Sequence, residues 1–215
     1  KMADYPINLR IAGKKCIVVG GGAVACRKVK SLLAAGAEVT VFSPALTPEL
    51  AEMVKKKQFN YVARPYQKGD LSGFFLVICA TDDPSVNEAV AEEAEEAGIL
   101  ANVVDVPELG NFSVPAQVKR GALLLTVSTG GKSPVMAKRL RQELAQQYGE
   151  EYGEYLDMVD KVRQELKQRL ATSKKRELFW RKTIDENVLA LLRQGRIEEA
   201  EAMICHAASS IVIES

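Results

Sequence analysis

The sequence predicts an α/β protein whose first half forms a doubly wound parallel sheet and whose last third is helical. Three observations support this prediction. A glycine-rich turn follows an apolar strand near the N-terminus, strands and helices then alternate, and strand signals end before residue 150. We expect three regions, 1–110, 111–149 and 150–215, of which the middle one is a small α+β region.

The glycine-rich turn indicates a dinucleotide site. The apolar run Ile17–Val19 is typical of a buried strand. The stretch that follows fits the pattern Gly-x-Gly-x-x-Ala at Gly20, Gly22 and Ala25. In a Rossmann-type unit these residues permit the turn, the approach of a pyrophosphate and the packing of a helix on the strand. The free N–H groups at the helix start also favour phosphate. A glycine turn without a ligand is the alternative.

The end of the second strand bears on the choice of cofactor. Gly36 ends the first helix, and a strand is predicted over 38–42. NAD-binding units often carry an acidic residue after this strand, where it binds the ribose hydroxyls. The stretch Phe42-Ser43-Pro44 has no acidic residue, and no arginine for a 2′-phosphate. We therefore expect NAD rather than NADP.

Capped helices and apolar strands alternate over the rest of the first half. Thr47 and Pro48 predict a helix start, and that helix runs to about Lys57. A second helix is predicted from Pro84 to Ala97. Further strands are predicted over 59–62, 74–80 and 99–104. This β–α–β alternation predicts a doubly wound parallel sheet.

The pattern changes after Pro107. Two strands are predicted, over 112–118 and 122–128, around the turn Arg120-Gly121. Ser133 and Pro134 predict the start of a helix. One face of that helix carries Met136, Leu140, Leu144 and Tyr148.

The C-terminal third contains helical patterns only. An apolar seam recurs three and four residues apart, at Tyr152, Tyr155, Val159, Val162 and Leu166. Such a seam predicts packing in a helical bundle or, equally, a dimer surface. A second helix face contains Phe179, Trp180, Ile184, Val188 and Leu191. A last helix is predicted from Ile197 to about Cys205.

Composition argues against several classes of function. The chain has 29 Lys and Arg against 28 Asp and Glu, which gives no electrostatic case for nucleic acid or an anionic membrane. We expect no membrane span and no signal peptide. Four scattered cysteines without a C-x-x-C pair, and His206 as the single histidine, predict a reduced, cytoplasmic setting and no metal site.

The candidate catalytic group is Asp105. Ligands of open α/β sheets bind at the carboxyl ends of the strands, where Gly20–Gly22, Thr81–Pro84 and Asp105 should meet. A carboxylate there would be partly desolvated and could act as a general base. A cap for the following loop is the alternative. We expect Asp82 and Asp83 to cap the helix that starts at Pro84.

The stretch from Ser128 to Ser133 is a candidate anion site. It combines hydroxyl groups, two glycines and a predicted helix start, which together offer many hydrogen-bond donors. It is not a P-loop, because Thr126 stands where that motif requires glycine. A substrate carboxylate would suit this stretch. A simple N-cap turn is the alternative.

Four motifs in this order resemble the precorrin-2 dehydrogenase family, the dehydrogenase and ferrochelatase module of siroheme synthase. They are Gly20-Gly21-Gly22-Ala23-Val24-Ala25-Cys26-Arg27-Lys28, Ala80-Thr81-Asp82-Asp83, Asn102-Val103-Val104-Asp105 and Val127-Ser128-Thr129-Gly130-Gly131-Lys132-Ser133-Pro134. The resemblance covers about residues 5–180 and implies NAD-dependent oxidation of precorrin-2 to sirohydrochlorin. It also implies a homodimer in which residues 111–149 form the dimerisation region.

The resemblance assigns roles to individual residues. It implies Asp105 as the catalytic group, and Thr129 stands where some relatives have a phosphorylatable serine. The expected cofactor-binding residues are Gly20, Gly21, Gly22, Ala23, Val24, Ser43, Pro44, Ala45, Thr81 and Asp82. The expected substrate-binding residues are Asn102, Ser128, Thr129, Gly130, Gly131, Lys132 and Ser133.

Three functions remain open on the sequence. The first is a dehydrogenase, and the second is a bifunctional enzyme that also inserts Fe²⁺ into sirohydrochlorin. The third is a non-catalytic dinucleotide sensor that dimerises through its helices. This sequence contains no counterpart of the methyltransferase that is fused to larger siroheme synthases. We therefore expect another enzyme to supply precorrin-2.

Overall fold

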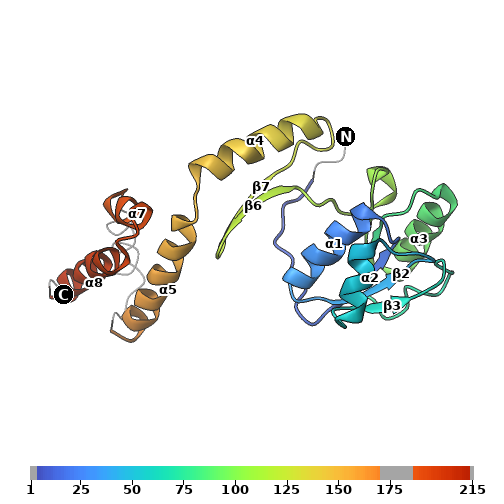
Figure 1. The fold of residues 1–215 in the computed structure, drawn as a ribbon. Helices are drawn as coiled ribbons and strands as arrows, with labels where there is room; N and C mark the ends of the chain where they lie inside the picture. The colour runs from blue at the N-terminus through green and yellow to red at the C-terminus, as the bar shows by residue number, and fades with distance from the viewer. Residues whose placement is uncertain (1–3, 170–185, 214–215) are drawn as a thin grey trace. The chain divides into compact units, whose positions relative to one another are not determined.

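The computed structural model describes residues 4–169 and 186–213. The chain forms two compact units, Lys1–Val114 and Pro115–Ser215, and each is described by itself (Figure 1). Among the described residues, no helix is both long and apolar enough to cross a membrane.

The first unit contains the predicted parallel sheet. Its strands are β1 (Lys15–Val19), β2 (Glu38–Phe42), β3 (Asn60–Val62), β4 (Leu76–Cys79) and β5 (Leu100–Val103), in the order β3-β2-β1-β4-β5. Every neighbouring pair is parallel. The order reverses between β1 and β4, and such a switch point opens a crevice at the carboxyl ends of the two strands.

The described part of the first unit has three α-helices, and the predicted caps start two of them. They are α1 (Ala23–Ala34), α2 (Pro48–Lys55) and α3 (Pro84–Ala97). The hydroxyl of Thr47 accepts a hydrogen bond from the N–H of Leu50, and Asp83 accepts from the N–H of Ser85 at 2.9 Å. Gly98 ends α3 in the left-handed conformation. Asp83 is therefore the predicted cap, whereas no capping bond involves Asp82.

The sheet is buried on both faces, which explains why its strands are continuously apolar. Alternate side chains of a strand point to opposite faces. Cys16 and Val18 of β1 pack with residues of α1, whereas Ile17 and Val19 pack with residues of α3. Helices therefore cover both faces of the sheet, with α1 and α2 on one face and α3 on the other (Figure 1).

The second unit begins with a hairpin of β6 (Ala116–Arg120) and β7 (Leu123–Val127). The first strand starts four residues later than predicted. Proline lacks an N–H for strand pairing, and Pro115 immediately precedes β6. Phe112 instead packs against the core of the first unit. The helices are α4 (Pro134–Gln147), α5 (Glu151–Arg169), α7 (Glu186–Arg193) and α8 (Ile197–Ile213).

Part of the predicted apolar seam is a bundle core. Tyr155 and Val162 of α5 are buried together with Val188 of α7 and Ile204 of α8. In contrast, α4 buries none of its residues within the chain, and Met136 is 54% exposed. Helix α8 ends at Ile213, later than predicted. Predicted positions outside the description are Phe179, Trp180, Ile184 and the side chain of Leu166.

A buried carboxylate fastens the loop between β3 and β4 to α3. Glu93 is 8% exposed and accepts hydrogen bonds from the N–H groups of Gly69 and Leu71 and from the Tyr66 hydroxyl. Burial and the neighbouring carboxylate raise the pKa of Tyr66, so its hydroxyl remains a donor. Three donors from one loop thus compensate the desolvation of a single acceptor.

We expect Glu93→Gln to destabilise the protein by about 2–4 kcal/mol, because an amide offers one acceptor where three donors meet. Urea unfolding followed by circular dichroism measures the loss. Glu92→Gln changes an exposed neighbour on the same helix and should leave the midpoint unchanged. Equal midpoints for the two variants would contradict this role of Glu93.

Candidate cofactor and substrate site

The fold itself requires glycine at the first two positions of the glycine turn. Gly20 has a φ of +121°, and a Cβ there would lie 2.2 Å from the carbonyl oxygen of Ala80. A Cβ on Gly21 would lie 1.9 Å from the carbonyl oxygen of Ala45. The N–H of Gly20 also donates to the carbonyl of Phe42 at 2.9 Å. The turn is therefore held between the ends of β2 and β4.

Gly22 differs from its neighbours because nothing in the fold requires glycine there. Its φ is −80°, and a Cβ would meet no atom within 4 Å. It is the N-cap of α1 without a side-chain cap, and Ala23 beside it is exposed while Val24 is half-buried. Uncapped helix N–H groups next to open space are suited to a pyrophosphate. The glycine turn thus fits a dinucleotide.

The loop after β2 packs directly against the glycine turn. The N–H of Thr47 donates to the carbonyl of Gly21 at 2.9 Å. The buried Ser43 hydroxyl donates to the carbonyl of Ala45 at 2.6 Å, and Tyr61 donates its hydroxyl to the Ser43 carbonyl at 2.9 Å. These bonds give Ser43 a shaping role. Pro44 and Ala45 are exposed and available to a ligand.

An arginine that the local sequence pattern missed lies beside the end of β2. Phe42 pairs in register with Val62, which brings Arg64 to the same edge. The Arg64 guanidinium lies 5.1 Å from the centre of the Phe42 ring and makes two hydrogen bonds of 2.7 Å to Asp70. Its charge is therefore already paired. Arg64 is brought to the end of β2 by the parallel register of β2 and β3, and not by proximity in the sequence.

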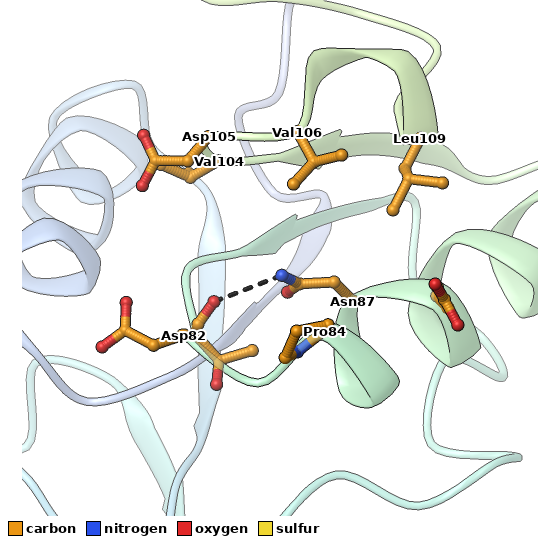
Figure 2. A pocket seen from close by; sticks show the side chains of 9 residues that line it. Asp82, Pro84, Asn87, Val104, Asp105, Val106 and Leu109 are labelled. Carbon is orange, nitrogen blue, oxygen red and sulfur yellow. Dashed lines mark hydrogen bonds between the residues drawn. The ribbon is translucent and has the colours of Figure 1, made fainter.

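A cavity of about 320 Å³ opens between the loops that follow β4 and β5. Thr81 and Asp82 line one wall, and Asp105 with Val106 lines the other (Figure 2). The two aspartates come from opposite walls, and their carboxylates lie on the same side of the cavity in Figure 2. Two of the three loops predicted to meet thus line one cavity, and the third, the glycine turn, approaches the backbone of Ala80 and Thr81 at the same edge of the sheet.

Asp105 is exposed, which corrects the expectation of a partly desolvated carboxylate. The chain turns immediately after β5, and Asp105 adopts a φ of +67°. This left-handed conformation is uncommon for residues other than glycine, and asparagine and aspartate tolerate it best. The turn carries Asp105 past the end of the strand, so its side chain is not enclosed by the apolar core.

Asn87 is a cavity residue that sequence reasoning missed. It is 6% exposed, accepts a bond from the Cys79 thiol at 3.1 Å and donates to the Thr81 carbonyl at 3.3 Å (Figure 2). Burial raises the pKa of Cys79 to about 12, which keeps the thiol protonated as a donor. An asparagine one helical turn after the Asp83 cap was the available signal.

Asn102 points away from the core that contains its neighbours. Ala101 and Val103 pack with α3, so the alternating Asn102 faces the α1 side of the sheet. Its amide nitrogen donates to the Phe112 carbonyl at 3.1 Å, and its buried oxygen has no partner. Asn102 does not line the cavity that contains Asp105. The unpartnered oxygen leaves one acceptor for a ligand or water.

The predicted anion loop belongs to the second unit. The N–H of Gly130 donates to Ser128, and the N–H groups of Ser133 and Met136 donate to the hydroxyls of Thr129 and Ser133. Gly130 and Gly131 both have positive φ, and Lys132 is exposed. The predicted cap at Ser133 is confirmed. The hydroxyl groups of this loop already accept hydrogen bonds from the loop itself. The exposed ammonium group of Lys132 is therefore the clearest contact for an anion.

Within residues 4–169 and 186–213, no group of three or more His, Cys, Asp or Glu side chains could hold a metal ion.

Three family models match successive parts of the chain. A putative NAD(P)-binding family matches residues 7–116, the central region of sirohaem biosynthesis proteins matches 120–147, and the sirohaem synthase dimerisation region matches 151–207. The glycine turn and the first match define an NAD(P)-binding protein of the Rossmann class.

Relatives identify the family further. Siroheme synthase of Methylobacillus flagellatus is 42% identical over 83% of this chain, and that of Nitrosococcus oceani is 38% identical over 94%. The solved structure of SirC, a precorrin-2 dehydrogenase, has a TM-score of 0.75 at 29% identity and covers 93% of this chain and 99% of its own. The chain belongs to the precorrin-2 dehydrogenase family, which includes the dehydrogenase module of siroheme synthases. It spans 38% and 43% of the length of the two siroheme synthases.

We predict that Gly22→Val lowers NAD affinity at least tenfold, because its side chain occupies the open space at the α1 N-terminus and one lost phosphate bond costs about 1.5–3 kcal/mol. Calorimetric titration with NAD, and in parallel with NADP, measures the effect. Gly98→Asn is the control, since Gly98 also has open surroundings and asparagine tolerates its left-handed backbone. Unchanged affinity in a folded Gly22→Val protein would contradict a pyrophosphate position at Gly22.

Proposed function

We propose that this chain catalyses the NAD-dependent dehydrogenation of precorrin-2 to sirohydrochlorin, with Asp105 as the general base. The observation that carries the proposal is the position of Asp105 in a cavity at the same sheet edge as a glycine turn suited to pyrophosphate. The match with SirC along almost the whole chain supports the choice of reaction.

The reaction requires the removal of a hydride and a proton from a reduced tetrapyrrole. The bound nicotinamide supplies the hydride acceptor, and the remaining tasks fall to the chain. The glycine turn and the loop that follows β2 hold the dinucleotide. The cavity wall at Thr81 and Asp82 positions the nicotinamide. Asp105 accepts the proton. Its exposed carboxylate is accessible to a large substrate, which on binding would exclude water from it.

NAD is the proposed cofactor in preference to NADP. The loop Ser43–Ala45 offers no cation to a 2′-phosphate, and the nearby Arg64 is already paired with Asp70. A 2′-phosphate would therefore have to displace a two-bond ion pair.

We place the carboxylates of the tetrapyrrole on the loop from Ser128 to Ser133, and a pyrrole N–H group on Asn102. Lys132 and the N–H groups of the loop from Ser128 to Ser133 supply positive charge and donors. Asn102 contributes its unpartnered amide oxygen, which suits an N–H donor of a pyrrole ring rather than a carboxylate.

A homodimer is the proposed working form. Residues 151–207 match a dimerisation region, and α4 presents an apolar strip that the chain itself does not bury. Val135 is 80% exposed and Met136 is 54% exposed. Burial of this strip against a second copy would remove large apolar side chains from water.

We expect Asp105→Asn to reduce the rate of precorrin-2 oxidation by roughly 10²–10⁴-fold, the usual contribution of a positioned base. Asparagine keeps the size and tolerates the left-handed backbone, but it cannot accept the proton. NADH formation under anaerobic conditions measures the rate. Calorimetry should show nearly unchanged NAD affinity, since the pyrophosphate position at Gly22 is separate.

Two further variants complete this test. Asp105→Gly keeps the backbone conformation without a carboxylate and should be as slow as Asp105→Asn. Asp83→Asn keeps the cap of α3 and lies next to Asp82, so it should retain normal activity. A normal rate in Asp105→Asn would exclude Asp105 as the base. Incubation of the unsubstituted protein with sirohydrochlorin and Fe²⁺ tests for the second activity, the insertion of iron.

Sedimentation should show a dimer at micromolar concentration. Val135→Glu and Met136→Glu together place two charges on the exposed strip of α4 and should shift the population toward monomer. A separate variant, Lys138→Glu, changes the net charge on the same helix without altering Val135 or Met136, and it serves as the control. A stable monomer of the unsubstituted chain would contradict the proposed dimer.

A further inference from the structure

A second cavity lies on the α1 side of the sheet, apart from the one that contains Asp105. It has a volume of about 150 Å³ and lies entirely within the first unit. Four segments form it: the N-terminal segment with Leu9, helix α1 with Lys28 and Ser31, strand β4 with Ile78, and the segment of Phe112. Most of its lining is apolar, and the volume accommodates a ring or a short aliphatic chain.

Lys28 is the only charged side chain in the lining of this cavity. It is half-buried, and no hydrogen bond or ion pair joins its ammonium group to another described residue. Lys30, two residues later, instead pairs with Glu49 at 2.6 Å. Burial, and to a smaller extent the charge of Arg27, lowers the pKa of Lys28. An unpaired ammonium against apolar walls is unfavourable unless an anion joins it.

Two lining residues of the cavity are neighbours of Asn102 in β5, whose amide oxygen has no partner. Ile78 pairs with Asn102 in the strand register, and the Phe112 carbonyl accepts a hydrogen bond from its amide nitrogen. Asn102 does not itself line the cavity, so Lys28 is the charged group that the lining offers to a ligand.

We propose that this cavity is a binding site for a carboxylate on a short apolar stem, with Lys28 as its cationic partner. The walls take the stem, and the ammonium pairs with the carboxylate through a charge-assisted hydrogen bond. Such a group is found on a free small acid and on the side arms of a tetrapyrrole. The second source rests on the proposed function, and the first does not.

The test begins with direct binding to the intact protein. Hexanoate is titrated at millimolar concentrations while the methyl signals of Leu9, Ile11 and Ile78 are followed by NMR, and hexanamide serves as the neutral probe. We expect shifts confined to the cavity, with hexanoate binding at least tenfold more tightly than hexanamide, as a charged hydrogen bond predicts. Equal affinity for the two probes, or no shifts, would overturn the proposal.

Variants separate a ligand site from a structural role. Lys28→Met keeps the stem and removes the charge, so it should weaken hexanoate binding about tenfold and raise the melting temperature of the unliganded protein. A lysine that stabilised the fold would give a lower melting temperature and overturn the proposal. Lys30→Met removes a charge from the same helix outside the cavity and should leave hexanoate binding unchanged. Ser31→Leu fills the cavity from an exposed position and should abolish binding while Lys28 remains.

Steady-state kinetics with precorrin-2 distinguish the two sources of the carboxylate, a side arm of the tetrapyrrole and a free small acid. With precorrin-2, Lys28→Met should raise KM at unchanged NAD affinity if an arm of the substrate occupies the cavity. An unchanged KM together with hexanoate binding assigns the cavity to a free acid. If the unsubstituted chain does not oxidise precorrin-2 at all, the proposed function fails, while the hexanoate titration still decides the cavity.

Discussion

The close approach between Gly20 and the carbonyl of Ala80 is the constraint on which the site depends. It brings the carboxyl end of β1 against that of β4, where the strand order reverses. Gly21 is held against Ala45 in the same way. These two contacts leave no room for side chains at Gly20 and Gly21. Gly22 then lies at an open helix start, and the cavity of Asp105 opens beside the next strand end.

Most of the first unit could be predicted from the sequence because its signals are local. Caps at Thr47 and Asp83 and the glycine stop at Gly98 define helices within one or two residues. The apolar runs of β1 and β4 are continuous because both of their faces are covered, and their alternation with helices predicts a parallel sheet. The first strand of the hairpin was predicted to start four residues too early, because Phe112 continues the apolar pattern whereas Pro115 interrupts pairing.

The candidate site was predictable only where one segment carries the information. Gly22 and Asp105 belong to recognisable sequence patterns. The exposure of Asp105, however, depends on a positive φ that could not be predicted from the sequence. Arg64 reaches the end of β2 through strand register, and the orientation of Asn102 depends on which face its neighbours bury. The sequence does not indicate that Lys28 lines a cavity, because that cavity is assembled from distant segments. Such tertiary placements are not contained in local periodicity.

The four cysteines report on the two units separately. Cys16, Cys26 and Cys79 are buried in the first unit, and burial raises the pKa of each thiol, that of Cys16 to about 11. Thiolates are the reactive species, so these groups react with an alkylating reagent only when the sheet opens. Cys205 lies exposed on α8 in the second unit. Mass spectrometry of labelled peptides would therefore time the opening of the nucleotide-binding unit against an internal standard on the same chain.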